Sequence, residues 1–305
     1  MKSYDAVVIG GGPAGMTAAL YLLRAGVKTA MAEKLSPGGQ VLMTSEIENY
    51  PGFPKGLQGW ELADKFANHL EDYDLHRIND EVREIKVGSP WHTLVVGDEE
   101  VRAKAVVLAT GSRYRKLGVP GEERLLGRGV SYCALCDGNF FRGRDVAVIG
   151  GGNSALEEAL YLARLVNKVY LIHRREDFRG HICYQNKCFA HEKIKVIRNK
   201  VVDEIVGGSD VEALALRDVC NGEQSRLELD GVFIFVGFEP IIDFVPKDIE
   251  MVPNGVVTDV EMRTNVPGIF AAGDIRAKQC RQVASAVGDG ATAATAAFSY
   301  LEKLD

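Results

Sequence analysis

The feature that most constrains the fold is a strand, glycine turn and helix pattern that occurs twice in 305 residues. Near the N-terminus, the apolar run Tyr4–Ile9 leads into a turn with glycines at its first, third and sixth positions, Gly10, Gly12 and Gly15, and then into an Ala- and Leu-rich stretch. These periodicities predict a buried parallel strand followed by a helix. Glycines at this spacing allow a tight turn, close approach of a pyrophosphate to backbone N–H groups, and close packing of helix on strand.

An acidic residue follows the next apolar run. Glu33 ends the predicted strand at 27–32 and lies 23 positions after Gly10. This is close to the offset of about 20 residues at which an acid hydrogen-bonds a ribose hydroxyl. Because a carboxylate repels a 2′-phosphate, the first pattern predicts a site for a dinucleotide that lacks one.

The second copy of the pattern begins at 145–149 and continues into Gly150-Gly151-Gly152-Asn153-Ser154-Ala155. His173 takes the position of the acid, and Arg174, Arg175 and Arg179 follow it. Arginines attract a 2′-phosphate, so this copy predicts an NADP(H) site. In the alternative interpretation, these arginines form a solvated surface and pair with Glu176 and Asp177.

A C-x-x-C pair, Cys133 and Cys136, lies before the second pattern and is followed directly by Asp137. Two cysteines at this spacing can meet at the start of a helix, where the helix dipole lowers a thiol pKa, and Asp137 could transfer the proton that thiol exchange needs. The alternative is half of a zinc site, completed by Cys183 and Cys188 with His181 beside them. Cys183 and Cys188 are five positions apart, and on a helix this separation points two side chains about 140° apart, which argues against that set.

Composition limits the classes of function. The chain is 46% hydrophobic and 26% charged, with a net charge of −6, which is typical of a globular protein. At about 150 residues per domain, its length predicts two domains. Mixed charge signs provide no basic stripe, so no nucleic-acid partner is expected. No apolar run approaches the roughly 20 residues of a membrane span, so no membrane partner is expected. The six sparse cysteines with one C-x-x-C pair favour a cytoplasmic protein.

With these motifs, the sequence resembles the low-molecular-weight thioredoxin reductases, which are FAD- and NADPH-dependent pyridine nucleotide-disulfide oxidoreductases. The resemblance runs from Tyr4 to the last helix. It also rests on Gly38-Gly39-Gln40, Glu48-Asn49-Tyr50-Pro51-Gly52, Ala109-Thr110-Gly111, Gly273-Asp274 and Arg281-Gln282-Val283. It implies an α/β fold with two Rossmann-like, three-layer nucleotide-binding domains, in which the NADPH domain (114–241) is inserted into the FAD domain (1–113 and 242–305).

The resemblance also implies which residues hold the cofactors, and it implies no metal. FAD would be bound by Gly10, Gly12, Pro13, Ala14, Gly15, Glu33, Gly39, Gln40, Asn49, Thr110, Gly111, Asp274, Arg281, Gln282 and Val283. NADPH would be bound by Gly150, Gly152, Asn153, Ser154, His173, Arg174, Arg175 and Arg179.

The implied activity is reduction of oxidised thioredoxin by NADPH through FAD and the Cys133–Cys136 pair. Cys136 would be the sulfur nearer the flavin, Cys133 the nucleophile and Asp137 the acid, in a homodimer. Two alternatives share the fold: a dithiol oxidase that passes electrons to oxygen, and a reductase of another protein disulfide. A sensor or zinc protein without turnover is the alternative from another class. The arginine group favours a reductase, because an oxygen-using oxidase does not need NADP(H).

Overall fold

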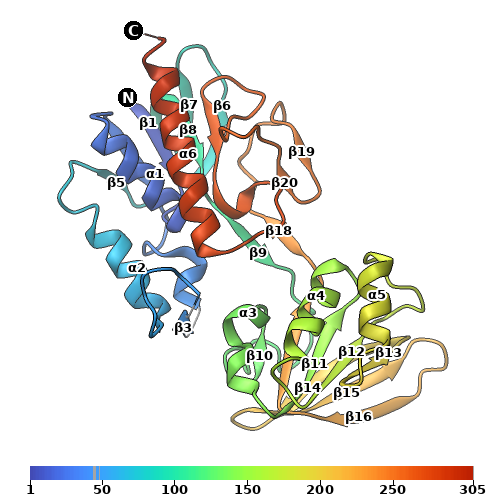
Figure 1. Ribbon diagram of the computed structural model, residues 1–305. Helices are drawn as coiled ribbons and strands as arrows, with labels where there is room; N and C mark the ends of the chain where they lie inside the picture. The colour runs from blue at the N-terminus through green and yellow to red at the C-terminus, as the bar shows by residue number, and fades with distance from the viewer. Residues whose placement is uncertain (44–45, 48, 305) are drawn as a thin grey trace. The chain divides into compact units, whose positions relative to one another are not determined.

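The computed structural model describes residues 1–43, 46–47 and 49–304 (Figure 1). Glu48, part of one motif above, lies outside this range. The chain forms two compact units, one made of residues 1–113 with the chain from Glu239 onward, the other of 114–238. The second unit ends at Phe238, whereas the sequence predicts that it ends three residues later, at residue 241. The reason for the difference is local: Ile241 N donates to Gly111 O at 3.1 Å, and Ile242 packs in the core of the first unit.

The first unit is built on a mainly parallel sheet. Its strands run in the order β5 (His76–Ile78), β2 (Thr29–Ala32), β1 (Lys2–Ile9) and β8 (Glu99–Leu108). Beyond β1, β8 pairs in parallel with β21 (Ile269–Ala271) and antiparallel with β7 (His92–Val96), which pairs with β6 (Val82–Lys86). The carboxyl ends of the parallel strands therefore meet at one edge of the sheet, where such folds bind ligands.

Both faces of this sheet are buried. Ala6 and Val8 of β1 pack in a core with α1 (Pro13–Arg24) and α6 (Val283–Leu301), whereas Val7 and Ile9 pack on the opposite face against the 244–256 segment. A strand buried on both faces needs an uninterrupted apolar run, as the sequence of β1 has. The unit therefore has three layers.

Helices α1 and α6 lie side by side on one face of the sheet (Figure 1). Their contact surfaces are rich in alanine, and a Cβ on Gly290 of α6 would clash with the Ala14 carbonyl of α1. Small side chains thus bring the two helix backbones close together. Helix α1 begins at Pro13, whose fixed φ suits the first helical position.

The second unit repeats this arrangement. Its parallel strands run in the order β10 (Val130–Ser131), β17 (Gly231–Phe235), β11 (Asp145–Gly150), β12 (Lys168–Ile172) and β13 (Ile194–Ile197). One face carries α3 (Ala134–Asp137), α4 (Asn153–Leu162) and α5 (Ile182–Phe189). The other packs on an antiparallel sheet of β14 (Lys200–Gly207), β15 (Val211–Asp218) and β16 (Gln224–Glu228). The predicted α/β class and the repeat of the strand, turn and helix pattern are confirmed.

Shorter elements complete the units. They are η1 (Gly39–Met43), β3 (Glu46–Ile47), β4 (Leu57–Gln58), α2 (Gly59–Asn68), β9 (Ser112–Tyr114), η2 (Gly138–Phe141), β18 (Phe238–Pro240), β19 (Met251–Val252), β20 (Gly255–Val256) and η3 (Gly273–Ile275). The chain leaves the first unit through β9 and returns through β18. Over the described ranges, no helix is both long and apolar enough to cross a bilayer.

Helix α4 buries a carboxylate that gives the first testable prediction. Within the described ranges, Oε2 of Glu158 has no hydrogen-bond partner, and burial, with a smaller effect of the Glu157 charge, raises the pKa of Glu158 to about 7. Between the ordinary carboxyl pKa and pH 7 the folded chain binds more protons than the unfolded chain, so stability falls as pH rises through this window. Glu158→Gln removes the buried charge. We expect it to increase the free energy of unfolding by about 1–3 kcal/mol at pH 8 and to change it little at pH 4.

The measurement is the thermal midpoint of the cofactor-free protein across this pH range, with an exposed glutamate of the same unit substituted, Glu204→Gln, as the matched control. A midpoint for Glu158→Gln that matches wild type at pH 8 would show that the Glu158 carboxylate is solvated.

Candidate active site

The first glycine turn joins β1 to α1 and uses its glycines in two ways. Gly10 has a φ of +106°, and a Cβ on Gly15 would clash with the Gly10 carbonyl, so both positions are needed for close backbone packing. A Cβ on Gly12, in contrast, would meet nothing within 4 Å. Gly12 therefore leaves open space in front of the first N–H groups of α1, as a bound pyrophosphate would require.

Glu33 lies beside this turn. Its Oε2 accepts a hydrogen bond from Gly11 N at 2.8 Å, and its Oε1 accepts one from Leu35 N at 2.9 Å. Each oxygen retains a lone pair that a ribose hydroxyl can use. The strand β2 thus delivers the acid to the turn, as its spacing predicts.

Residues from two later segments approach the same turn. A Cβ on Gly39 would lie 3.2 Å from the Cα of Gly12, and the Gln40 side chain donates from Nε2 to Ser112 O. At the end of β8, Thr110 donates from Oγ1 to Ile241 O at 2.8 Å. The predicted Gly39-Gln40 and Thr110-Gly111 segments therefore belong to one edge of the first sheet.

The start of α6 supplies the last predicted group. Gln282 is the N-cap residue, Val283 is the first helical residue, and Asn49 donates from Nδ2 to Gln282 Oε1 at 3.1 Å. The Arg281 guanidinium donates to the carbonyls of Lys278 and Asn254 at 2.9 and 3.1 Å. Arg281 therefore braces the loop that leads into α6.

A buried charge network holds the Gly273–Asp274 turn, and the sequence motifs missed it. Oδ2 of Asp289 accepts from Gly273 N at 3.0 Å and from Lys278 Nζ at 2.9 Å, while its Oδ1 pairs with Arg276 at 2.9 Å. A charged residue inside the Ala-rich helix α6 was the signal that could have revealed it.

Asp274 itself has an acceptor without a hydrogen bond. Within the described residues, its buried Oδ1 has no hydrogen-bond partner, and Lys278 Nζ lies 3.7 Å away. Burial raises the pKa of Asp274, and the charges of Lys278 and Arg281 oppose that shift. A hydroxyl-rich ligand would satisfy this oxygen. Asp274 and the open space at Gly12 both fit the ribityl diphosphate part of FAD.

The second glycine turn has the same construction. A Cβ on Gly152 would meet nothing within 4 Å, and Ala155 packs where the first turn has its third glycine. Asn153 Oδ1 accepts from His181 N at 2.7 Å, and Arg179 N donates to Gly151 O at 2.8 Å. These bonds attach the arginine-bearing loop directly to the turn. Ser154 is exposed in the first turn of α4.

His173 packs beneath this turn. Its ring is buried, a Cβ on Gly151 would clash with it, and Nε2 lies 3.2 Å from Asp177 O. Burial lowers the pKa of His173; the carbonyl of Asp177 opposes this, and the nearby arginine charges lower the pKa further. His173 is therefore neutral at pH 7, so the arginines supply the positive charge.

The side chains of Arg174, Arg175 and Arg179 are exposed, and no ion pair engages them within the described ranges. Glu176 instead contacts Arg198 at 4.0 Å and accepts from Asn199 at 2.7 Å. Within the described residues, these arginines form no ion pair with Glu176 or Asp177, although their exposure is also what a solvated surface would show. Three cations thus surround the loop next to Gly151.

Cys133 and Cys136 form a disulfide with a Cα–Cα distance of 5.3 Å. Cys133 is the N-cap residue of α3, and Cys136 N lies 3.2 Å from the Cys133 sulfur. Cys183 is exposed, whereas Cys188 is buried and its thiol lies 3.4 Å from Leu156 O. The described residues contain no group of three or more His, Cys, Asp or Glu able to hold a metal ion, so the zinc alternative lacks a ligand set.

The segment that precedes the disulfide is firmly anchored. Tyr132 donates to Glu122 Oε1 at 2.7 Å and stacks on Tyr114 with ring centroids 5.1 Å apart. Glu122 is 1% exposed and also accepts from the N–H groups of Leu117 and Gly118 at 2.9 and 2.7 Å. No sequence motif had indicated this cluster, because Tyr132 lies ten residues after Glu122 and no local pattern relates the two.

Asp137, the last residue of α3, is half-buried and bonded to Ser131, whose Oγ lies 2.6 Å from Asp137 Oδ2. Burial raises the pKa of Asp137, and the Ser131 hydrogen bond lowers it by a smaller amount. The disulfide thus has a carboxyl group beside it that exchanges protons closer to neutral pH than a solvated aspartate does.

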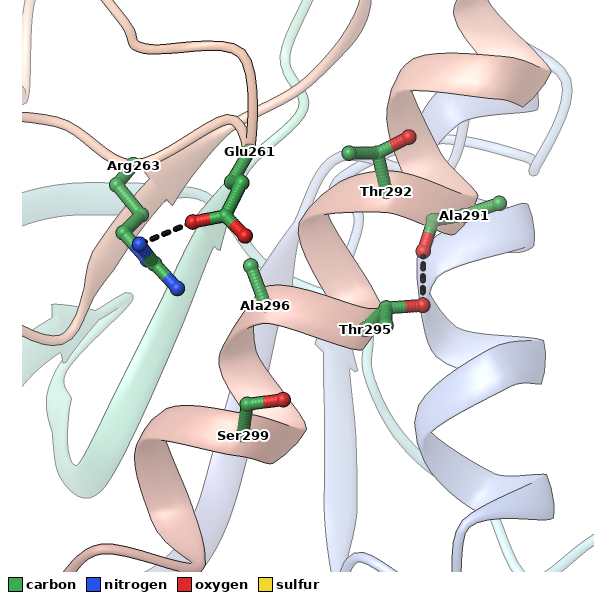
Figure 2. Close-up of a pocket in the computed structure, with 7 residues that line it drawn as sticks. All are labelled: Glu261, Arg263, Ala291, Thr292, Thr295, Ala296 and Ser299. Atoms are coloured by element: carbon green, nitrogen blue, oxygen red, sulfur yellow. Dashed lines mark hydrogen bonds and ion pairs between the residues drawn. The ribbon is translucent and has the colours of Figure 1, made fainter.

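A separate pocket of about 280 Å³ lies on the outer side of α6 (Figure 2). None of its lining residues is a predicted site residue. Thr295 already donates to Ala291 O at 2.9 Å, and Glu261 pairs with Arg263, as Figure 2 shows. Four of its polar side chains, Glu261, Arg263, Thr292 and Thr295, therefore already have partners, which leaves few polar groups to orient a ligand.

Comparison with known proteins decides the family. Residues 4–290 match the pyridine nucleotide-disulphide oxidoreductase family. The chain is 46% identical to thioredoxin reductase of Listeria innocua, over 99% of this chain and 95% of that protein, and 43% identical to that of Bacillus subtilis, over 99% and 96%. The crystal structure of thioredoxin reductase from Streptococcus pyogenes superposes with a TM-score of 0.92 at 44% identity, covering 99% of each chain.

The chain belongs to the pyridine nucleotide-disulphide oxidoreductases, among the thioredoxin reductases. It is therefore an oxidoreductase whose family works with a flavin and a pyridine nucleotide, and the predicted family is confirmed. The individual residues that hold each cofactor remain predictions, which the geometry above makes specific.

The two kinds of glycine in the first turn give a matched pair of variants. Gly12→Ala places a methyl group in the open space and should weaken FAD binding at least about 10-fold while the apoprotein keeps its thermal midpoint, because no protein atom is displaced. Gly15→Ala forces the strand and helix apart and should lower the midpoint of the apoprotein itself. FAD titration followed by flavin fluorescence, together with thermal unfolding, measures both. Wild-type FAD affinity in a folded Gly12→Ala variant would mean that the ligand does not lie over this turn.

Proposed function

We propose that this protein reduces oxidised thioredoxin with NADPH, through bound FAD and the Cys133–Cys136 disulfide. The observation that carries the proposal is the disulfide with a buried acid, Asp137, in the same unit as a nucleotide turn flanked by three arginines. The names of the relatives support thioredoxin as the electron acceptor. We further propose that the protein acts as a homodimer, in the cytoplasm.

FAD binding is assigned to the first unit. The Gly12 turn would receive the diphosphate, Glu33 a ribose, and Asp274 a hydroxyl, because these groups offer the open space and unsatisfied acceptors described above. When bound, FAD would supply hydride acceptance from NADPH and electron delivery to the disulfide. The chain contributes position and electrostatics.

NADPH binding is assigned to the second unit. The Gly152 turn would receive its diphosphate, and the exposed guanidiniums of Arg174, Arg175 and Arg179 would bind the 2′-phosphate. The attachment of Arg179 and Gly180 to the Gly151 carbonyl keeps this charge beside the turn. An NADPH site of this kind favours a reductase over an oxygen-using oxidase, because the oxidase does not need NADP(H).

Thiol exchange would proceed on the reduced pair. The Cys133 thiolate attacks one sulfur of the thioredoxin disulfide, and the departing sulfur takes a proton from the Asp137 carboxyl. The Asp137 carboxylate then accepts the Cys136 thiol proton, and Cys136 attacks the Cys133 sulfur. This step re-forms the Cys133–Cys136 disulfide and releases the second thioredoxin sulfur, which is protonated from solvent.

The first test is anaerobic NADPH oxidation by the FAD-loaded protein, with and without oxidised thioredoxin. We expect thioredoxin-dependent turnover in wild type and in Cys183→Ser, a control that removes an exposed thiol of the same unit. Cys133→Ser should still show flavin reduction by NADPH but should lose turnover to background. Rapid flavin reduction without turnover in wild type would exclude thioredoxin as acceptor. Turnover that appears only when the assay is repeated in air would favour the oxidase alternative.

The arginine group gives a separate prediction. Replacing Arg174, Arg175 or Arg179 with Gln should lower kcat/KM for NADPH about 10-fold each, because each variant loses a charge-assisted contact to the 2′-phosphate. Values for NADH should stay near wild type. Arg164→Gln, an exposed arginine just beyond the C-terminal end of α4, is the control. Equal losses with NADPH and NADH would contradict 2′-phosphate recognition by these residues.

A further inference from the structure

Ser131 lies between the redox pair and the acid. It is the last residue of β10 and is 3% exposed. Its Oγ accepts a hydrogen bond from Cys133 N at 3.0 Å, and lies 2.6 Å from Asp137 Oδ2 and 3.3 Å from Cys133 O. The Ser131 hydroxyl therefore contacts both the backbone of Cys133 and the side chain of Asp137.

The hydrogen-bonding capacity of this hydroxyl is limited. A serine hydroxyl has one hydrogen and two lone pairs, and the Cys133 N–H occupies one lone pair. The single hydrogen has two acceptors within reach, Asp137 Oδ2 and Cys133 O. Which acceptor receives it depends on whether Asp137 carries a proton.

We propose that Ser131 is a positioning residue that couples the protonation of Asp137 to the backbone of Cys133. When Asp137 is ionised, Ser131 donates to Oδ2. When Asp137 is protonated, its own O–H donates to the second lone pair of Ser131, and the serine hydrogen turns to Cys133 O. The bonds rearrange by rotation of two O–H groups, and no heavy atom has to move. This inference rests on the proposed function, in which Asp137 is the acid.

The surroundings of Asp137 make the coupling measurable. Helix α4 packs on α3 and carries Glu157, which is exposed, and Glu158, which is partly buried; η2 carries no charged residue. The pKa of Asp137 has burial as its largest cause and the Ser131 bond as the opposing one, and neither glutamate contributes. Removing the hydroxyl therefore leaves burial unopposed, which raises the pKa of Asp137 further.

Removing the Ser131 hydroxyl should therefore shift the pH dependence of thioredoxin reduction to higher pH. Proton donation to the departing thioredoxin sulfur requires protonated Asp137, so its rate falls as pH rises through the Asp137 pKa. In Ser131→Ala this fall should move to higher pH by about one unit, because the ionised form of Asp137 loses a stronger hydrogen bond than the protonated form does. Ser131→Thr retains the hydroxyl and should restore the wild-type profile.

The experiment measures the rate at which the pre-reduced, FAD-loaded enzyme reduces excess oxidised thioredoxin in a single turnover, from pH 5 to 9. An aromatic disulfide whose leaving thiol is strongly acidic serves as the comparison substrate, because such a thiolate leaves without a proton. The predicted shift appears with thioredoxin and not with the aromatic disulfide. Thermal midpoints and FAD content verify that each variant is folded and loaded.

Asp137→Asn and the double variant separate the two levels of the proposal. If Asp137→Asn keeps the wild-type rate and profile, the assignment of Asp137 as acid in the proposed function is wrong. If Asp137→Asn removes the pH dependence but Ser131→Ala keeps the wild-type profile, only the coupling is wrong. A shift in Ser131→Ala that disappears when Asp137→Asn is also present supports the coupling.

Discussion

The whole architecture depends on the close approach of a strand end to the start of a helix. In the first unit that approach is possible only because Gly10 and Gly15 have no side chains between β1 and α1. In the second unit the third position is Ala155, and a Cβ on Gly150 would clash with its methyl group, so the approach depends on Gly150. The sheets carry buried side chains on both faces, so their carboxyl ends and the helix N-termini open onto the same edge. Backbone N–H groups at the start of a helix can bind an anion without any contribution from a side chain.

The two turns differ in the electrostatics of the residue that ends the second strand. Glu33 is fixed by two backbone N–H groups and brings negative charge to the first turn. His173 is buried and neutral, so at the second turn it acts by packing beneath Gly151, and the charge comes from exposed arginines carried on the loop that follows. The same backbone design therefore carries opposite charges at the two turns, through the few side chains at one strand end.

Sequence reasoning predicted those features whose physical cause is local. Glycine spacing, the position of Glu33 and the meeting of Cys133 with Cys136 follow from backbone geometry over short stretches, and the structure agrees with each. It missed the Asp289 network with Arg276 and Lys278, and the contact of Tyr132 with Glu122. These contacts join residues that lie 10 or more positions apart in the sequence. The apolar periodicity of a helix or strand does not predict which polar groups meet when the elements pack.

The helix that follows Cys133 is too short to act on the thiols as the sequence predicts. Helix α3 has only four residues, and so short a helix has little macrodipole. In the disulfide form, Cys136 N donates to the Cys133 sulfur at 3.2 Å. That contact keeps its position only if the backbone around Cys133 is fixed. Ser131 fixes it on one side, and the hydrogen bond of Tyr132 to the buried Glu122 fixes the residue before it. Hydrogen bonds on the N-terminal side of the pair thus hold its backbone, whereas the short helix that follows has little dipole to contribute.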